Sequence, residues 1–205
     1  MPASTSRFAQ LLRTLLITHL AVLLSACLAL SEKPLSAPDA SAVDADLIGA
    51  WQLSDDEGGT VTVHIGKENS LYCHPCAHAL VYIEQFGDGR LSGDSYQGFV
   101  SRLGKLRYMN VRYRDPDRIT EGYLFIRYAL AGPDRLEVRI IDPEKLAKLV
   151  ESKRLGGKLD AAGTGPAVLL TDPTSQLAGY FADPASDAAF GPVQTFVRIK
   201  PAPTP

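Results

Sequence analysis

The stretch Leu47-Ile48-Gly49-Ala50-Trp51-Gln52-Leu53 decides how the chain is expected to fold. Its apolar residues mark the beginning of a first strand, and polar turn residues follow at 55–59. Residues 60–65 then alternate small polar and branched apolar side chains, which is the period-two pattern of a half-buried strand. The two segments predict a β-hairpin at the head of a folded domain, which we place at residues 47–200.

Further strand candidates follow this hairpin at short, regular spacing. They are rich in aromatic and β-branched residues, and turn residues such as Gly87-Asp88-Gly89 separate them. Repeated short strands of this kind predict a mainly β fold, an antiparallel meander that forms a barrel or a sandwich. The candidates are residues 79–86, 96–103, 106–113, 122–131 and 135–141.

The pattern changes before the last strand. Asp142-Pro143-Glu144 combines a helix cap, a proline at the first helical position and an acid in the first turn, and apolar residues follow at helical spacing. Asp172-Pro173 repeats the start signal before residues 177–181. We therefore expect two short helices, and then a final strand at residues 193–200.

The motif Gly49-Ala50-Trp51 resembles the Gly-x-Trp motif that opens lipocalins and their calycin relatives. In that superfamily the tryptophan closes one end of the barrel and an arginine of the last strand covers it. Arg198 is the residue here that matches, so the resemblance implies barrel-end packing of Gly49, Trp51 and Arg198 in a calycin-like β-barrel. A guanidinium can stack on such a ring. The alternative is that Trp51 is an ordinary core aromatic of another β-fold.

The order of elements over residues 47–200 also resembles small bacterial lipoproteins with a lipocalin-like domain. That resemblance implies a fold and a location. The second lipocalin motif, Thr-Asp-Tyr, is absent, because Thr171-Asp172-Pro173 lies too late in the chain and matches a helix start.

An export signal occupies residues 1–26. Arg7 and Arg13 precede an apolar run that ends at Leu24, and small residues follow it. The run is too short to span a bilayer, which takes roughly 20 apolar residues. The tetrapeptide Leu24-Ser25-Ala26-Cys27 resembles the lipobox of bacterial lipoproteins.

The lipobox resemblance implies cleavage before Cys27, a diacylglyceryl group on its sulfur and a fatty acyl chain such as palmitate on its amino group. Multiple acyl chains anchor a protein stably to a membrane. Leu28 stands where an aspartate would resemble an inner-membrane retention signal, so we expect an outer-membrane protein that faces the periplasm.

The segments that flank the predicted domain lack periodicity. Residues 27–46 are rich in Ala, Ser, Pro and Asp, which predicts a lipidated cysteine followed by a disordered tether that holds the domain off the membrane. The Pro-rich tail at residues 201–205 is also expected to be disordered.

Composition argues against several classes of function. Residues 1–26 contain two of the 21 basic residues and none of the 23 acidic residues, which leaves the mature chain with a net charge of −4. A nucleic acid is therefore not an expected partner. The chain contains no Gly-x-Ser-x-Gly, phosphate loop or His-Glu-x-x-His, so we predict no catalytic residue and no enzymatic activity.

The segment Cys73-His74-Pro75-Cys76-Ala77-His78 concentrates reactive side chains, and three interpretations stay open. In an oxidising compartment Cys73 and Cys76 form a disulfide. Alternatively Cys73, Cys76, His74 and His78, or the upstream His64, bind copper or zinc, which both accept thiolate and imidazole ligands. Lipoproteins of copper homeostasis and envelope stress are weakly similar in this respect. The third interpretation is a thiol redox pair.

Two hypotheses of function follow from these observations. The first is a non-enzymatic, lipid-anchored envelope protein that binds a hydrophobic or amphiphilic small molecule in its barrel, or that serves as an envelope interaction module. An interior filled by its own side chains would leave no room for a ligand. The alternative is a copper, zinc or redox sensor built on the Cys73-x-x-Cys76 segment.

Overall fold

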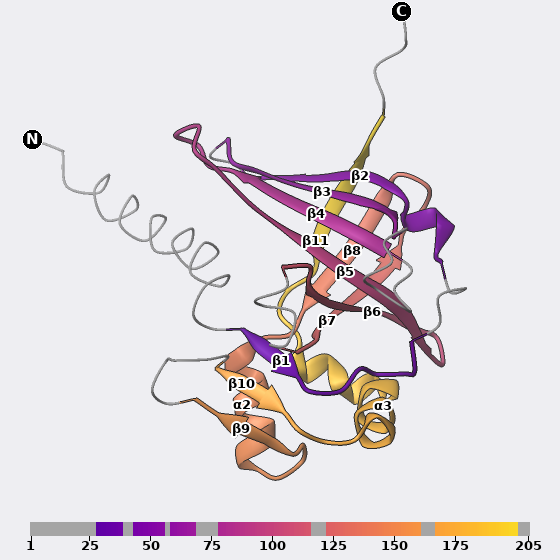
Figure 1. Ribbon diagram of the computed structural model, residues 1–205, viewed down its shortest axis with the longest axis vertical. Helices are drawn as coiled ribbons and strands as arrows, with labels where there is room; N and C mark the ends of the chain where they lie inside the picture. The colour runs from indigo at the N-terminus through magenta and orange to yellow at the C-terminus, as the bar shows by residue number, and fades with distance from the viewer. Residues whose placement is uncertain are drawn as a thin grey trace, which may run out of the picture.

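A computed structural model describes residues 28–38, 43–55, 58–68, 78–115, 122–160 and 167–200. Most of the described chain belongs to eight antiparallel strands (Figure 1). They are β2 (Gly49–Ser54), β3 (Thr60–Lys67), β4 (His78–Gln85), β5 (Leu91–Leu103), β6 (Leu106–Tyr113), β7 (Leu124–Leu130), β8 (Arg135–Ile140) and β11 (Gln194–Ile199).

These strands close into a barrel in the order β11-β2-β3-β4-β5-β6-β7-β8. Each strand from β2 to β7 pairs with the next one along the chain, and β11 closes the barrel by pairing with both β8 and β2. The predicted mainly β fold, an antiparallel meander closed into a calycin-like barrel, is confirmed.

Strand β5 begins earlier than predicted, at Leu91 instead of residue 96. Residues 91–95 are all exposed and contain Gly93 and Asp94, so no alternation of apolar side chains indicates a strand there. Pairing with β4 supplies their backbone partners, from Leu91 opposite Gln85 onward. The tertiary partner therefore overrides a weak local preference.

Both predicted helices are present before the last strand. In α2 (Pro143–Glu151) the side chain of Asp142 accepts hydrogen bonds from the backbone of Glu144 and Lys145, as its sequence predicts. Helix α3 (Thr174–Ala182) has no side-chain cap. The Asp172 carboxylate instead accepts a hydrogen bond from Gly156 N, 2.6 Å away. A 3-10 helix, η3 (Pro184–Ala189), follows and was not predicted.

The expectation of a disordered tether is wrong for the described part of residues 27–46. Strand β1 (Ala29–Ser31) pairs in parallel with β10 (Val168–Leu170), which pairs in turn with β9 (Gly157–Leu159). All three residues of β1 are buried, and the helix η1 (Ala45–Leu47) follows before β2. The strand partners that hold this segment in place lie about 140 positions later in the chain. The composition of the segment itself therefore does not indicate that it is ordered.

The segment after β1 also packs on the outer wall of the barrel. Leu35 is buried, and its N–H donates to Asn110 Oδ1 at 2.8 Å. The hydroxyls of Ser36 and Ser101 lie 2.6 Å apart. The folded domain therefore begins near residue 28 and not at residue 47. Residues 1–27, 39–42 and 201–205 lie outside the described part of the chain.

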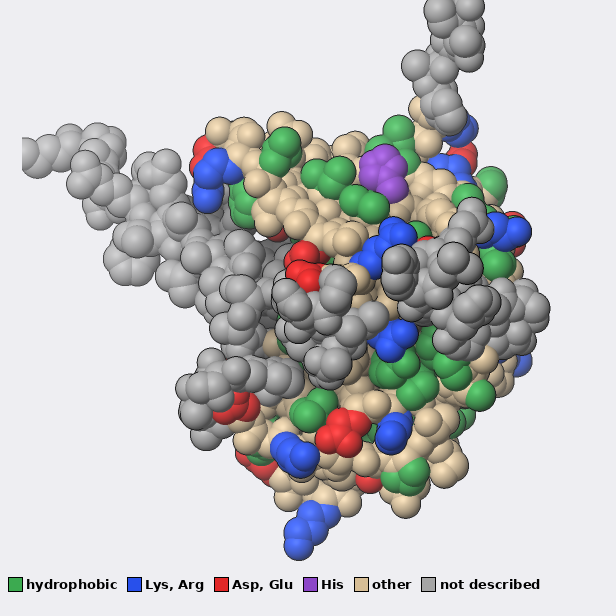
Figure 2. All heavy atoms as spheres, in the orientation of Figure 1, with side chains coloured by type: hydrophobic (Ala, Val, Ile, Leu, Met, Phe, Trp, Pro, Cys, Tyr) green, Lys and Arg blue, Asp and Glu red, His purple; other side chains and the backbone are tan. Residues whose placement is uncertain are grey.

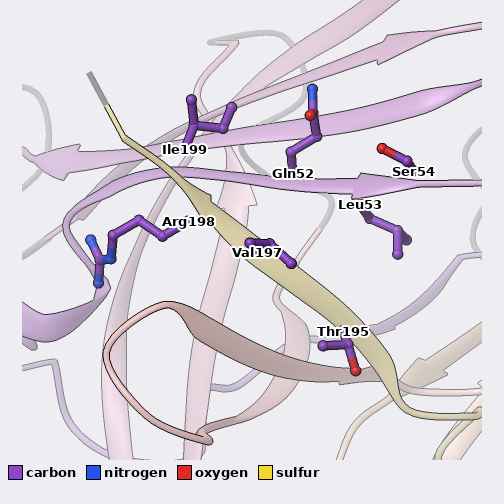
Figure 3. A pocket seen from close by; sticks show the side chains of 7 residues that line it. All are labelled: Gln52, Leu53, Ser54, Thr195, Val197, Arg198 and Ile199. Carbon is purple, nitrogen blue, oxygen red and sulfur yellow. The ribbon is translucent and has the colours of Figure 1, made fainter. Parts of the chain in front are cut away.

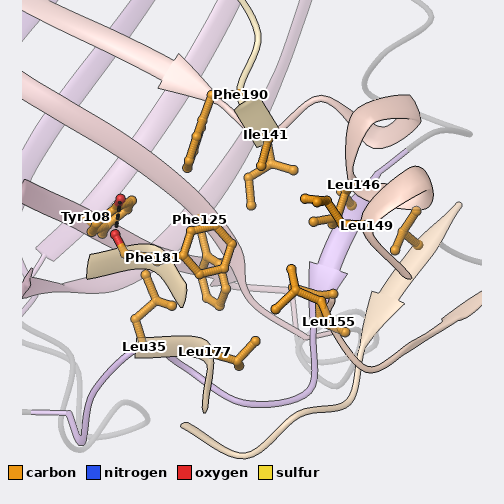
Figure 4. Packing of buried hydrophobic residues seen from close by; sticks show 14 residues of the cluster. Leu35, Tyr108, Phe125, Ile141, Leu146, Leu149, Leu155, Leu177, Phe181 and Phe190 are labelled. Carbon is orange, nitrogen blue, oxygen red and sulfur yellow. Dashed lines mark hydrogen bonds between the residues drawn. The ribbon is translucent and has the colours of Figure 1, made fainter. Parts of the chain in front are cut away.

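Two buried clusters hold the molecule together. One fills the barrel and surrounds Trp51, whereas the other lies between the outer face of β6 and β7 and the helices (Figure 4). In the second cluster, the Tyr108 hydroxyl donates to the Phe181 carbonyl at 2.8 Å. The helices and the three-stranded sheet are therefore packed on the barrel as part of one structure.

Candidate functional site

One end of the barrel is closed by η1 and the Trp51 side chain. The Trp51 ring is fully buried, and its Nε1 donates a hydrogen bond to Leu47 O at 2.8 Å. Arg198 is the register partner of Trp51 across β11 and β2, and its guanidinium carbon lies 4.0 Å from a Trp51 ring centroid. The cation therefore covers the ring at the rim of the barrel.

The Arg198 guanidinium also ties three backbone segments together. Its Nη1 donates to Ile48 O at 2.7 Å, and its Nη2 donates to Asp46 O at 2.6 Å. Its Nε donates to Pro133 O at 2.9 Å, in the turn between β7 and β8. The hydrogen-bonding capacity of Arg198 is therefore used to hold η1 over the barrel end.

Gly49 allows this close approach. A Cβ atom at Gly49 would lie 2.6 Å from Nη1 of Arg198, and the Gly49 φ angle of +142° is one that other residues rarely adopt. Gly49, Trp51 and Arg198 therefore form one contact, at the position that the resemblance to lipocalins assigns to them.

A buried polar cluster lies beneath η1. Asp44 is 5% exposed, and its Oδ2 accepts hydrogen bonds from the Tyr128 hydroxyl at 2.7 Å and from Arg107 Nη1 at 3.3 Å. The backbone N–H of Asp44 donates to His78 Nε2 at 3.1 Å. Four segments, the approach to η1 and strands β4, β6 and β7, therefore meet at Asp44.

Burial controls the protonation of two members of this cluster. Burial, reinforced by the hydrogen bond to the Asp44 carboxylate, raises the pKa of Tyr128 far above its usual range, so its hydroxyl stays a donor. Burial also lowers the pKa of His78, although the Asp44 charge and the Gly66 backbone oppose this shift. The neutral imidazole keeps Nε2 free to accept from the Asp44 amide.

The stability of the protein is expected to decrease as the pH falls below about 6.5, the ordinary imidazole pKa. In that range the unfolded chain protonates His78 more readily than the folded chain does, so protons favour unfolding. The His78 contribution is complete above pH 6.5 and is lost as the pH approaches the lowered folded pKa. Urea denaturation at pH 7.5, 6.5, 5.5 and 5.0 measures the slope.

The variant His78→Asn should flatten this pH dependence, whatever its own effect on stability. The exposed His64 on β3 provides the matched control, because His64→Asn removes an imidazole that lies outside the cluster. Equal pH slopes for the wild type and His78→Asn would contradict the prediction.

Hydrophobic side chains make up most of the interior of the barrel, and several of them are only partly buried. Side chains inside a closed barrel meet water only through its ends or through gaps between strands. Seven hydrophobic residues that pack against the interior cluster are only partly buried. They are Leu53, Val61, Val63, Tyr96, Ile126, Leu130 and Val138.

A polar pair also faces this interior. Glu84 is almost fully buried, and its Oε2 accepts a hydrogen bond from the Tyr82 hydroxyl at 3.3 Å. Burial, together with the Glu84 charge, raises the pKa of Tyr82 above its usual range. The pair places a hydrogen-bonded carboxylate on the face of β4 that also carries Leu80 and His78.

A groove of about 460 Å³ lies where β2 and β11 separate. The two strands pair only from Gln52 opposite Val197 to Ala50 opposite Ile199. Beyond Gln52 they diverge, and Leu53 and Thr195 lie on opposite sides of the gap (Figure 3). The groove is lined by Gln52, Leu53, Ser54, Thr195, Val197, Arg198 and Ile199.

The chemistry of this groove favours an uncharged or amphiphilic molecule. Leu53 packs against the interior cluster, so the groove touches the barrel core. Ser54 and Thr195 contribute hydroxyl groups, whereas the Arg198 guanidinium is held by three backbone carbonyls. The lining therefore combines apolar contacts with a few hydrogen-bonding groups, as small-molecule sites commonly do.

The groove adjoins exposed apolar side chains on the outside of the barrel. By strand register Ile199 lies beside Ala50, Ala50 beside His64, and His64 beside Val81. Ile199 and Val81 are exposed, and Figure 2 shows hydrophobic side chains on the barrel surface in this view. Exposed apolar side chains therefore lie on both sides of His64, and Ile199 also lines the groove.

The predicted lipidation, disulfide and metal sites involve cysteines that are not among the described residues of the barrel end or the groove. Cys27, Cys73, His74 and Cys76 lie outside the described residues, so their predicted roles stay predictions. His78 is described and fully buried, and a metal ion at its Nε2 would have to displace the hydrogen bond from Asp44. Within the described ranges, no group of three or more His, Cys, Asp or Glu is arranged to hold a metal ion.

Sequence reasoning missed Asp44, Arg107 and Tyr128. Asp44 belongs to the segment that was predicted to be disordered, and it lies 84 positions from Tyr128. No local pattern joins residues so far apart. The weak signal that was available is the aspartate just before the apolar stretch at residue 47, in a position to cap a short helix.

Comparisons with protein-family models, with curated proteins and with solved structures gave no match for this chain. Among the described residues, no helix has the length and apolar character needed to cross a membrane. The protein is described by its fold and its groove, as a calycin-like barrel with a lateral groove. The proposal of function rests on the geometry of these two features.

Proposed function

We propose that this protein binds a small apolar or amphiphilic molecule in the groove between β2 and β11. We also propose that it is a non-enzymatic lipoprotein, held to the outer membrane by lipid on Cys27 and facing the periplasm. The groove is the observation that supports the ligand, and the lipobox-like sequence at residues 24–27 supports the anchor.

The size and the lining of the groove support this kind of ligand. Its volume lies near the lower end of the range for small-molecule sites, roughly 300–1,000 Å³. Val197 and Ile199 offer exposed apolar surface, and Leu53 connects it to the barrel interior. Burying apolar ligand surface contributes about 25 cal/mol per Å².

The wild-type protein is expected to bind the fluorescent probe N-phenyl-1-naphthylamine with a Kd of about 1–100 µM, which corresponds to roughly 5–8 kcal/mol. Val197→Glu should raise this Kd about tenfold or more, because a carboxylate in the groove would have to lose water when the probe binds. Probe fluorescence during a protein titration measures both values.

Val193→Glu is the matched control. Val193 is 54% exposed and Val197 is 55% exposed, but only Val197 lines the groove. The control should bind the probe as the wild type does. Absence of wild-type binding, or equal weakening by the two variants, would contradict a ligand site in this groove.

A further inference from the structure

The chain becomes part of the fold immediately after the predicted lipid-bearing cysteine. Leu28 O accepts a hydrogen bond from Val168 N at 3.5 Å, and β1 begins at Ala29. Ser31 exchanges two backbone hydrogen bonds with Tyr123, at 2.9 and 2.8 Å. Ala29 and Leu30 are buried, so β1 is an integral strand and its first residue has a fixed place.

This placement limits the distance between the lipid and the domain. A chain spans at most about 3.3–3.6 Å per residue, so the Cα atoms of Cys27 and Ala29 are separated by no more than about 7 Å. The headgroup layer on each side of a bilayer is itself roughly 5–8 Å thick. A flexible 20-residue tether would instead give an average reach of about 25 Å.

The edge of the sheet next to the anchor carries an exposed leucine. By register Ala29 lies beside Val168, and Val168 lies beside Leu159. Neighbouring strands are about 4.8 Å apart, which places Leu159 roughly 10 Å from Ala29. Leu159 is 42% exposed although it is large and apolar.

The residue before this leucine belongs to an exposed ion pair with Glu32. The Lys158 side chain is 72% exposed, and its Nζ lies 3.4 Å from Glu32 Oε1. Exposed lysines close to a bilayer are attracted to anionic headgroups. The edge therefore combines an exposed apolar side chain with an exposed lysine that can exchange its Glu32 partner for a lipid phosphate.

We propose that the β1–β10–β9 edge rests on the bilayer surface, with the Leu159 side chain at the boundary between the headgroups and the acyl chains. The inference rests on the proposed lipid on Cys27 and fixes how the domain is oriented. Figure 1 shows the small sheet at one end of the molecule and the end of β11 at the other. The end of β11 therefore points away from the membrane.

Tryptophan reporters test this orientation in the full lipidated protein. The native Trp51 is the single tryptophan and is fully buried, so it gives a constant background. Leu159→Trp and Lys158→Trp place reporters at the edge, and Leu91→Trp is the distal control, because Leu91 is exposed, begins β5 at the hairpin with β4 and does not line the groove. The vesicles contain phosphatidylethanolamine and phosphatidylglycerol with brominated acyl chains, which quench tryptophan on contact.

The bromolipid should reduce the reporter emission of Leu159→Trp about twofold and leave Leu91→Trp unchanged, because only the edge side chain enters the lipid. Lys158→Trp should also be quenched, which keeps the test valid if one edge variant folds poorly. If the protein floats with the vesicles but bromolipid quenches the edge and distal reporters equally, the proposed orientation is wrong. The proposed lipid anchor would not be contradicted by that result.

Failure of the anchor has a different signature. Wild-type protein that stays in solution when the vesicles are floated would overturn both the lipid on Cys27 and the orientation that rests on it. Cys27→Ala is the control for the assay and should remain unfloated and unquenched, since one leucine is too weak an anchor by itself.

Discussion

Replacing Trp51 with alanine is expected to lower the free energy of unfolding by about 3–5 kcal/mol, the usual cost of deleting a large buried aromatic side chain. The ring is fully buried, lies 4.0 Å from the Arg198 guanidinium carbon, and donates a hydrogen bond to Leu47 O. All three contributions are lost together. Because small domains have only about 5–15 kcal/mol of stability, the variant should unfold at much lower urea concentration.

Circular dichroism is the appropriate measurement, because Trp51 is the only tryptophan and its variant loses the fluorescence signal. Trp51→Phe is the matched control. It keeps an aromatic ring under Arg198 but removes the Nε1 donor, so its cost should be smaller, about 1–2 kcal/mol. A cost below about 1 kcal/mol for Trp51→Ala would show that the barrel end does not depend on this ring.

Phe181→Ala is expected to cost about 3–5 kcal/mol as well, for a cavity in the second cluster. Phe181 is fully buried, and its ring centroid lies 5.5 Å from that of Phe125 and 6.0 Å from those of Tyr108 and Phe190. Aromatic pairs in edge-to-face geometry add stability beyond the buried area. Thermal and urea unfolding followed by far-ultraviolet circular dichroism measure the change.

The Phe181 variant also tests whether the helices and the barrel unfold together. Tyr108 and Phe125 belong to β6 and β7, so a cavity at Phe181 should lower a single cooperative transition that includes the barrel. Phe181→Leu, which keeps most of the volume, should cost less than Phe181→Ala. A separate early transition for the helices, with an unchanged barrel transition, would contradict this coupling.

The proximity of β1 to Cys27 changes the expected role of the N-terminal segment. Its Ala, Ser, Pro and Asp content predicts a spacer, but the segment places three residues in a sheet and packs Leu35 on the barrel wall. The predicted lipid would then hold the domain against the bilayer. In that orientation the end of β11, where Ile199 lines the groove, points away from the bilayer, so the ligand proposal and the orientation are independent and are tested separately.

Much of the barrel was predictable because its signals are local. The alternation at residues 60–65 indicates one buried strand face, and the observed β3 runs from Thr60 to Lys67. Asp142-Pro143-Glu144 predicts the start of α2 because a cap needs only backbone groups two and three residues away. The contact of Arg198 with Trp51 was suggested by family resemblance, and periodicity alone does not predict it.

The sequence by itself thus determined the class of fold, the order of strands and helices, and a lipobox-like signal that stays a prediction for residues 24–27. Only the tertiary structure decided that β1 is ordered, that Asp44 is buried beneath η1 and that β2 and β11 separate at a groove. The reason is physical. Strand alternation and helix caps depend on neighbours a few residues away in the sequence. The short strand β1, the buried Asp44 carboxylate and the gap between β2 and β11 depend instead on residues that are distant in sequence and that the fold brings together.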